Sequence, residues 1–351
     1  MDTPAFHLII NPSRYPQYSK ILKKRMKGIP AGQIHVSQNK AHFIHLVYEF
    51  LRSSEHYLLV WGGDGTANLA INTMVKNSKY RDISSKRIGF LRGGSGNGIQ
   101  DSYEVPLSLV KQIKCYLKSI EKDYYQKVDI LEVKNGQRKH YGQLFGIGID
   151  ASILAARNKR KSFFRKKNVT RPGMLSYILQ AIHIINKQAR RRTEKIKVKL
   201  KHGRFAYKGT RTNAEFPFNE YDFKTKAGMV EVGTRPYYGA FFRICPDVVC
   251  NDGYVDSYFF NFRNQWAVLA NLYNLWNGWY NRVNHKWAKK RLPLIQHFKS
   301  REISFKSKGS LLYHIDGELY QSEGDIRLKV RPEALKFIVP QSFWVKFHVQ
   351  T

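Results

Sequence analysis

The chain has 351 residues, of which 42% are hydrophobic and 14% aromatic, and this composition excludes a disordered or low-complexity protein. Its length suffices for one large domain or two modest domains, each with its own core. The 60 Lys and Arg residues against 26 Asp and Glu residues give a formal net charge of +34, which attracts polyanions and anionic membranes but defines no fold.

Several features of the chain bear on its location. Cys115, Cys245 and Cys250 have neither zinc-type spacing nor the even number of a disulfide framework, which favours a reducing compartment. The first residues lead into an apolar run without the parts of a signal peptide. No run is apolar over the length that a membrane-spanning helix needs. We therefore expect a cytoplasmic protein that reaches a membrane from the water side.

Short apolar runs alternate with helical patterns in the first third of the chain. Strands are predicted at residues 6–10, 56–61 and 87–91, and helices at residues 18–27, 66–75 and 108–119. This alternation predicts an α/β domain with a largely parallel sheet covered by helices.

A turn follows each predicted strand of this region: Asn11-Pro12, then residues 62–66, then residues 93–98. Glycines let a ligand approach the backbone, and amides at a helix N-terminus favour an anion such as phosphate. The carboxyl ends of parallel strands meet at one crevice, so the three turns together predict a nucleotide pocket, although each alone is more simply an ordinary turn. Neither glycine loop has the lysine of a P-loop, and Asp64 suits a metal ion or a proton better than a bare phosphate.

From residue 127 the pattern changes to strands joined by turns, which predicts a β-rich second domain in the form of a sandwich. Asn135-Gly136 is a signal for a tight hairpin. The predicted strands are residues 127–133, 139–149, 195–200, 229–232, 241–244, 254–260, 302–305 and 311–315.

Two further patterns in this half could mislead. Gly146, Gly148 and Ala151 formally match a dinucleotide-binding fingerprint, but the acidic residue expected about twenty positions later is replaced by a basic stretch. Aromatic and leucine residues recur at helical spacing within residues 265–287, which predicts one amphipathic helix that faces the core rather than a membrane anchor. These residues are Trp266, Leu269, Leu272, Trp276 and Trp279.

Seven short motifs, in this order, resemble the diacylglycerol kinase catalytic domain. This family is shared by diacylglycerol, sphingosine and ceramide kinases and bacterial lipid kinases, and it is related to NAD kinase. The resemblance extends over most of the chain. The motifs are Ile10-Asn11-Pro12, Gly62 to Thr66, Gly94-Ser95-Gly96-Asn97, Gly146-x-Gly148-x-Asp150-Ala151, Asn251-Asp252-Gly253-x-x-Asp256, Asp316-Gly317-Glu318 and Pro332-x-Ala334-Leu335.

The resemblance implies a fold and an activity. It implies a Rossmann-like nucleotide-binding α/β domain at residues 1–126 and a β-sandwich acceptor domain at residues 127–351, with the active site in the cleft between them. The last segment would pack back on the first domain. The implied reaction transfers the γ-phosphate of ATP, with Mg²⁺, to a lipid hydroxyl in phospholipid or sphingolipid metabolism.

The resemblance also implies roles for single residues. Asp316 would be the general base on the lipid hydroxyl, with Asp64 orienting the metal or taking that role instead. Glu318 would join Asp64 at the catalytic Mg²⁺, and Asp252 would hold a structural magnesium. Asp252 is equally well explained as a turn residue. From the residues alone, Asp316-Gly317 is better explained as a turn between strands, and the resemblance reverses that preference. The ATP site would be lined by Asn11, Gly62, Gly63, Gly65, Thr66, Gly94, Ser95, Gly96 and Asn97.

The second glycine loop departs from the spelling of many bacterial diacylglycerol kinases, which have Pro, Thr and a final Asp where this chain has Arg92, Ser95 and Gly98. Gly-Ser-Gly-Asn is closer to the sphingosine kinase spelling. Gly98 removes a carboxylate that could join the metal network, so the acceptor, diacylglycerol or a sphingoid base, stays open. Neither the acceptor nor the oligomeric state follows from the sequence.

Other functions compete with this interpretation. The basic clusters at residues 157–171 and 187–204 suit either an anionic membrane surface or a solvated face. Nucleic-acid binding would fit the charge, but no zinc-finger, RNP or helix-turn-helix spelling supports it. NAD kinase shares the Gly-Gly-Asp-Gly signature, but the Asn-Glu pair that it carries downstream is not found.

Overall fold

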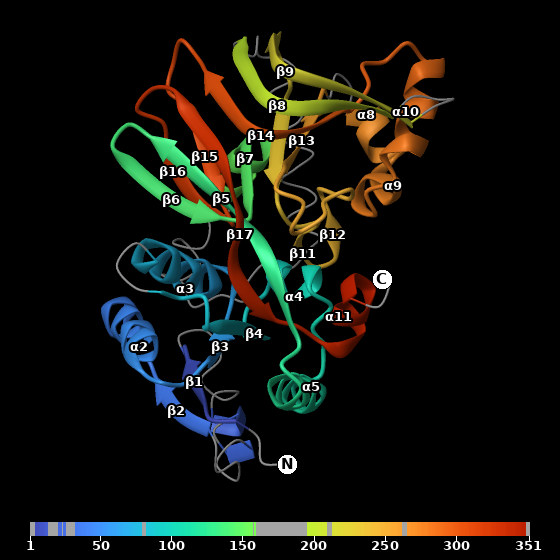
Figure 1. Cartoon of the computed structure of the whole chain (residues 1–351). Coiled ribbons are helices and arrows are strands. Elements are labelled where there is room, and N and C mark those ends of the chain that lie inside the picture. Colours follow the sequence, from blue (N-terminus) through green and yellow to red (C-terminus); the bar gives the residue numbers. More distant parts are fainter. Residues whose placement is uncertain are drawn as a thin grey trace, which may run out of the picture.

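The computed structural model of the protein describes residues 4–12, 20–22, 24–25, 32–78, 82–156, 158, 195–208, 213–261 and 265–348. Two lobes are visible in Figure 1: an N-terminal lobe of helices around a parallel sheet, and a lobe of mainly antiparallel strands next to it. Two long strands, β5 (Tyr125–Asn135) and β17 (Ile326–Ile338), run between the lobes. Among the described helices, none has the length and apolar character to cross a membrane.

Four parallel strands form the sheet of the N-terminal lobe, in the order β2-β1-β3-β4. Every residue of β3 is buried, as expected for a strand that is covered on both faces. Leu58 and Val60 belong to the core on one face, and Leu59 and Trp61 to the core on the other. The predicted parallel sheet is therefore confirmed. The strands are β1 (Phe6–Ile10), β2 (Gly32–Val36), β3 (Tyr57–Gly62) and β4 (Arg87–Arg92).

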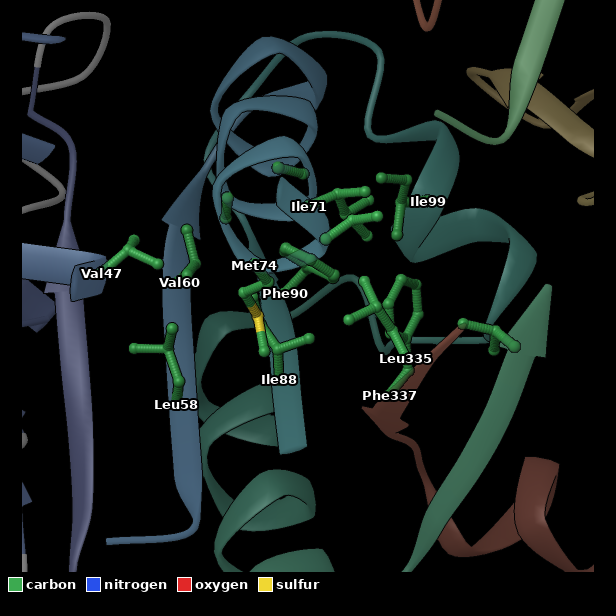
Figure 2. Close-up of a cluster of buried hydrophobic side chains, with 14 of the residues drawn as sticks. Val47, Leu58, Val60, Ile71, Met74, Ile88, Phe90, Ile99, Leu335 and Phe337 are labelled. Atoms are coloured by element: carbon green, nitrogen blue, oxygen red, sulfur yellow. The ribbon is translucent and has the colours of Figure 1, made fainter. Parts of the chain in front are cut away.

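Helices cover both faces of this sheet. On one face, α2 (Lys40–Arg52) and α3 (Asp64–Asn77) place Val47, Ile71 and Met74 against the strands, as Figure 2 shows. On the other face, α5 (Leu109–Glu121) packs Tyr116 against the strands. A short helix, α4 (Gly98–Ser102), follows the second glycine loop. The helices and strands thus leave the carboxyl ends of β3 and β4 facing the second lobe.

Antiparallel strands build the C-terminal lobe, in the order β16-β15-β7-β10-β13-β14-β17, with β8 paired to β14 and β9, and β6 paired to β5. A separate small hairpin is formed by β11 and β12. The predicted antiparallel sandwich is confirmed. The strands are β6 (Arg138–Gly142), β7 (Leu144–Gly148), β8 (Ile196–Lys208), β9 (Asn213–Thr225), β10 (Met229–Gly233), β11 (Tyr237–Gly239), β12 (Phe242–Arg243), β13 (Val255–Phe260), β14 (Gln296–Lys306), β15 (Leu312–Ile315) and β16 (Glu318–Gln321).

The end of the chain contributes to both cores. The first part of β17 places Leu328 in the core of the antiparallel lobe, whereas Leu335 and Phe337 lie in the core of the N-terminal lobe (Figure 2). Phe337 pairs in parallel with Ile88 of β4, and a register shift separates the two parts of the strand. The helix α11 (Gln341–His348) follows and adds Phe343 to the N-terminal core. The domain boundary at residues 126 and 127 stays a prediction.

Four local expectations meet different outcomes. The Asn135-Gly136 hairpin is present, with Asn135 paired to Arg138. The single strand predicted at residues 139–149 is wrong, because the chain breaks at Gln143 and β6 and β7 pair with different strands. In β7, Gly146 and Gly148 lie between antiparallel neighbours, so they form no dinucleotide-binding turn. Of the helix predicted at residues 18–27, only residues 20–22 and 24–25 belong to the described part.

The single core-facing helix predicted at residues 265–287 is also wrong. The segment forms three short helices, α8 (Gln265–Leu269), α9 (Leu272–Trp276) and α10 (Tyr280–Lys289). Gly278 interrupts the last two with a φ of 70°, and a Cβ there would lie 2.7 Å from Pro246. The breaks change which side chains face outward, and Trp266 is 68% exposed.

Candidate active site

Two glycine loops touch each other where β3 and β4 end. The first comprises residues 62–66 and the second residues 93–98. A Cβ on Gly94 would lie 2.5 Å from the Cα of Gly63, and a Cβ on Gly63 would lie 3.0 Å from the Cα of Gly94. A side chain at either position would therefore push the two loops apart. The loops form one continuous backbone surface because neither residue has a side chain.

Asp64 fastens the first loop to the second. Its Oδ2 accepts a hydrogen bond from the amide of Asn97 at 2.8 Å, and its Oδ1 accepts one from the amide of Gly98 at 2.7 Å. A Cβ on Gly96 would lie 2.5 Å from the Oδ2 atom. Burial raises the pKa of Asp64, and the Asp316 carboxylate adds to this, while the charge of Arg235 and the two amides act in the opposite direction. Two lone-pair directions of the carboxylate stay available to a ligand.

The other predicted nucleotide residues surround the same point. Asn11 donates its side-chain amide to the Thr66 hydroxyl at 2.9 Å, which connects the turn after β1 to the first loop. Asn97, in the left-handed conformation with φ of 57°, closes the second loop through both side-chain atoms onto Gly94. Ser95 is exposed at the tip of that loop. The structure thus brings the three predicted turns together at one edge of the sheet.

The N-terminus of α3 has the features of an anion site. Its cap residue, Gly63, makes no side-chain capping bond, and the first amides of a helix have no partner within the helix. The helix dipole favours negative charge at the same place. A phosphate group would fit here, because the glycine backbone allows close approach and the amides supply donors.

Gly98 is surrounded by the other lobe. A Cβ on this residue would overlap the backbone carbonyl of Tyr238 and lie 2.5 Å from Nη1 of Arg235. Ala240 also donates its amide to the carbonyl of Gly96 at 3.0 Å. The small β11–β12 hairpin therefore packs directly on the second glycine loop, and it fills the space that a side chain at position 98 would need.

Asp316 lies in a two-residue hairpin turn between β15 and β16. Asp316 and Gly317 have φ values of 47° and 84°, as in a type I′ turn. The carboxylate is nevertheless buried, and it accepts hydrogen bonds from the backbone amide of Leu144 at 2.9 Å and from that of Gln143 at 3.1 Å. The turn interpretation and a functional carboxylate are therefore compatible at this residue.

Two side chains that the sequence did not single out complete the surroundings of Asp316. Asn68 of α3 donates to its Oδ2 at 2.9 Å, and Arg235 donates to its Oδ1 at 3.2 Å. Arg235 is only 1% exposed, and its charge also acts on Asp64. No sequence signal marks Arg235, which follows β10 in an ordinary Thr-Arg-Pro turn. Asn68 lies one helical turn after Asp64, a spacing that could have indicated it.

Glu318 reaches the first glycine loop from the opposite lobe. A Cβ on Gly65 would lie 2.9 Å from its Oε1 atom, so the carboxylate touches the residue that follows Asp64. Glu318 itself is exposed. Carboxylate oxygens are the protein ligands that Mg²⁺ prefers, and Mg²⁺ commonly bridges one or two of them to phosphate. The donors present at Asp64 and Glu318 therefore fit this ion.

Asp252 has different surroundings. Its Oδ2 lies 2.8 Å from the ammonium group of Lys299, and its Oδ1 accepts a hydrogen bond from the amide of Tyr254 at 3.1 Å. Asp129, nearby, uses its carboxylate for the amides of Gly253 and Glu333 at 2.7 and 2.8 Å. An ammonium group occupies the position of a counter-cation here, so the residues present do not fit the predicted structural magnesium.

Comparison with protein families agrees with this geometry. The diacylglycerol kinase catalytic domain matches residues 7–133, and the YegS C-terminal NAD kinase beta sandwich-like domain matches residues 166–339. The protein is therefore a kinase-type phosphotransferase. It belongs to the family of the diacylglycerol kinase catalytic domain. No curated protein sequence matches the chain.

Two solved bacterial structures share the fold. A diacylglycerol kinase from Bacillus anthracis str. Sterne is 16% identical with a TM-score of 0.60, covering 98% of this chain and 99% of that one. A second structure from the same organism, provisionally named a diacylglycerol kinase, is 18% identical with a TM-score of 0.63, covering 98% and 97%. An NAD kinase from Archaeoglobus fulgidus in complex with ATP is 10% identical with a TM-score of 0.42, covering 97% and 96%.

Proposed function

We propose that the protein is a lipid kinase that uses ATP and Mg²⁺ to phosphorylate the hydroxyl group of diacylglycerol, a sphingoid base or a related lipid. The observation that carries this proposal is the position of Asp64, which is held between two glycine loops and lies next to the point that Glu318 reaches from the other lobe. Phosphate-binding backbone and metal-binding carboxylates are thus adjacent, as phosphoryl transfer requires.

The nucleotide would bind along the two glycine loops. Its phosphates would accept hydrogen bonds from the first amides of α3, where Gly63 leaves the backbone accessible. Asn11 and Ser95 would bound the pocket, and Asn97 keeps the second loop in shape. When bound at Asp64 and Glu318, Mg²⁺ would neutralise the charge of the phosphates.

The acceptor hydroxyl must lose its proton as its oxygen bonds to the γ-phosphorus and the bond to the ADP oxygen breaks. Asp64 and Asp316 are the candidate bases, and their hydrogen bonds divide the roles. Asp316 has four donor groups around it, so all its lone-pair directions are used, whereas among the described residues Asp64 accepts from two amides. The geometry favours Asp64 as the group that takes the proton or orients the metal, and Asp316 as the residue that holds Arg235 near the transferred phosphate.

A lipid substrate would require contact with a membrane, and the three helices α8, α9 and α10 offer a suitable surface. Trp266 and Tyr273 are 68% and 69% exposed, and residues 257–301 contain no Asp or Glu. Arg282 lies over the ring of Trp279 at 4.2 Å from its centroid. Exposed Trp and Tyr beside basic residues suit the interface of an anionic bilayer. We propose this surface as the docking site of a cytoplasmic, peripherally associated protein.

The basic clusters predicted at residues 157–171 and 187–204 lie mostly outside the described residues. Within the described part, Lys197, Lys224, Lys306 and Arg327 line an open hollow of about 850 Å³ on the outer face of β8, β9, β14 and β17. Lys197 is directly opposite Lys224 on one side and Lys306 on the other. Asp325 pairs with Lys306 at 3.5 Å, and Asp222 and Glu302 also line the hollow, so these basic side chains have acidic neighbours and give no separate support for an anionic partner.

The test is an assay of the purified protein with labelled ATP and Mg²⁺ on mixed micelles that each contain one acceptor: diacylglycerol, sphingosine, ceramide, phosphatidylglycerol or monoacylglycerol. We expect phosphate transfer to one of these lipids and none to NAD. Transfer to NAD alone would establish the NAD kinase alternative. Salt-dependent binding to DNA without ATP turnover would instead support a nucleic-acid-binding protein.

A further inference from the structure

Three titratable side chains meet inside the antiparallel lobe, away from the glycine loops. Asp150, Glu231 and His314 are all buried, and each offers one ligand atom within 4.8 Å of the other two. Within the part of the chain that the structure describes, this is the one group of His, Cys, Asp or Glu residues with such spacing. The residues come from three different elements: Glu231 from β10, His314 from β15, and Asp150 from the helical turn after β7.

The strand register explains why the three side chains converge. Glu231 and His314 are both cross-strand neighbours of Gly146, one on each side of β7. A Cβ on Gly146 would overlap the Nε2 atom of His314 and lie 2.5 Å from Oε1 of Glu231. The absence of a side chain at position 146 therefore lets the imidazole and the carboxylate approach each other across the central strand.

Glu231 lacks the partners that a buried carboxylate normally has. The residue is 0% exposed, and neither of its carboxylate oxygens has a hydrogen-bond partner among the described residues. Its Oε2 atom lies 3.8 Å from Nε2 of His314, and that same nitrogen lies 2.5 Å from Oδ2 of Asp150. A buried carboxylate without hydrogen bonds is costly, which indicates that a group is needed at this point.

The charges of the cluster indicate what kind of group fits. The two carboxylates carry two negative charges when ionised, and a neutral imidazole offers a nitrogen lone pair toward them. A protonated imidazole would compensate one of these charges, whereas a divalent cation would compensate both. Imidazole nitrogen together with carboxylate oxygen suits Zn²⁺ and its neighbours in the first transition row, while Ca²⁺ requires six to eight oxygen ligands.

We propose that Asp150, Glu231 and His314 bind a divalent transition cation of the Zn²⁺ class, which ties the helical turn after β7 to β10 and β15. Zn²⁺ with ligands at about 2.0–2.2 Å needs ligand atoms about 3.4 Å apart, so the His314 to Asp150 contact widens by about 1 Å on binding. Three protein ligands leave one tetrahedral position for water. His314 is two residues before Asp316, so the cation stabilises the strand that presents the Asp316 turn to the active site.

A second buried histidine shows why the proposal is specific to this cluster. His297 also lies between two carboxylates, with Nε2 at 2.5 Å from Asp256 and Nδ1 at 4.0 Å from Asp247. Its carboxylates face opposite nitrogens of the ring, so no single cation can reach all three groups. His297 is therefore a matched control for a buried histidine that has carboxylate neighbours but no shared cation.

The experiment measures metal binding directly and does not depend on kinase activity. The full-length protein is stripped with a chelator and titrated with Zn²⁺ by calorimetry, and separately with Co²⁺ by visible absorption. We expect about one Zn²⁺ per chain, a raised melting temperature, and Co²⁺ d–d bands without a thiolate charge-transfer band. The last point separates this site from the three cysteines.

Variants complete the test. Glu231→Gln and His314→Gln are expected to weaken Zn²⁺ binding by about a hundredfold or more. Even the loss of a residue that only hydrogen-bonds to a metal ligand costs about 10–100-fold in affinity. His297→Gln should bind Zn²⁺ as the parent protein does. The proposal is overturned by a stoichiometry far below one, by a thiolate band, or by unchanged affinity in both variants. If a variant does not fold, the Co²⁺ spectrum of the parent protein still decides.

Discussion

The two sides of the active site are built by different means. On the N-terminal side, backbone amides and closely packed glycines form the site, and Asp64 is held by the amides of Asn97 and Gly98. On the C-terminal side, buried side chains form it, and Asp316 is held by Asn68 and Arg235 as well as by amides. A carboxylate that accepts hydrogen bonds from backbone amides can be neutralised without creating a buried unpaired charge. When a carboxylate that pairs with a buried arginine is neutralised, the arginine is left as a buried unpaired charge.

The first prediction uses this difference, and it concerns Asp316→Asn. The change leaves Arg235, which is 1% exposed, without its carboxylate partner. Loss of one partner from a buried pair costs about 3–5 kcal/mol of unfolding free energy. We also expect turnover to fall at least about a hundredfold, because Arg235 loses the carboxylate that holds it near the transferred phosphate. Urea unfolding and the micelle assay measure the two effects.

Asp325→Asn is the matched control for this change. Asp325 pairs with Lys306 at 3.5 Å on the surface, where an ion pair contributes about 0–1 kcal/mol. Its loss should therefore leave both stability and turnover nearly unchanged. If Asp316→Asn behaves like Asp325→Asn, the buried pair with Arg235 has no part in either property.

The second prediction concerns Asp64→Asn, whose effect should fall on activity and much less on stability. Asparagine can still accept one of the two amide hydrogen bonds, and it leaves no buried cation unpaired. It loses the negative charge that a metal or the hydroxyl proton requires, so turnover should fall at least about a hundredfold. The measurement is kcat over a titration of Mg²⁺, together with urea unfolding.

Asp82→Asn provides the comparison, because Asp82 is an exposed carboxylate that hydrogen-bonds to Ser84 near the surface. Normal turnover of Asp64→Asn would remove this residue from the mechanism. A stability loss as large as that of Asp316→Asn would contradict the contrast between the two sides of the site.

The same contrast explains what the sequence could predict. A site made of backbone requires glycines at fixed places after strands, and these are visible as Gly62 to Thr66 and Gly93 to Gly98. The parallel sheet was predictable because its strands are continuous apolar runs. The buried side chains have a weaker signal: Asp316 was indicated only by its motif, and Asn68 and Arg235 meet it only through the tertiary fold.

Other features required the third dimension for the same reason. Nothing in the sequence shows that Lys299 reaches Asp252, because the two residues belong to different strands of the sandwich. The helix predicted at residues 265–287 failed because apolar residues from Trp266 to Trp279 recur every three or four positions, as in a helix, while Gly278 needs a positive φ that ends the helix. Periodicity thus indicates an element type, but a single backbone requirement can override it.

The third prediction restores the carboxylate that many bacterial relatives have in the second loop, by Gly98→Asp. A side chain here would overlap the carbonyl of Tyr238, so the β11–β12 hairpin must move. Overpacking of this kind costs about 1–3 kcal/mol of unfolding free energy. The shift also disturbs the hydrogen bond that Asp64 accepts from the amide of Gly98. Gly98→Ala tests the steric part alone. Thermal unfolding and kcat are measured for both variants. A gain of activity in Gly98→Asp would contradict this account.

The last prediction has the smallest effect and concerns the surface of α8, α9 and α10. The double change Trp266→Ser and Tyr273→Ser removes two exposed aromatic side chains without altering the core. If they insert into the membrane interface, sedimentation with vesicles that contain anionic lipid should weaken about tenfold, since bilayer affinity scales with the buried apolar area. Tyr48→Ser, at an exposed tyrosine of α2 in the other lobe, is the control and should bind as before. Equal vesicle binding by all three proteins would show that this surface is not the docking site, while leaving the assignment of the glycine loops intact. If the difference in vesicle binding between the double variant and the parent protein disappears at high salt, the attachment depends on the basic residues alone. The apolar contribution of Trp266 and Tyr273 does not depend on ionic strength.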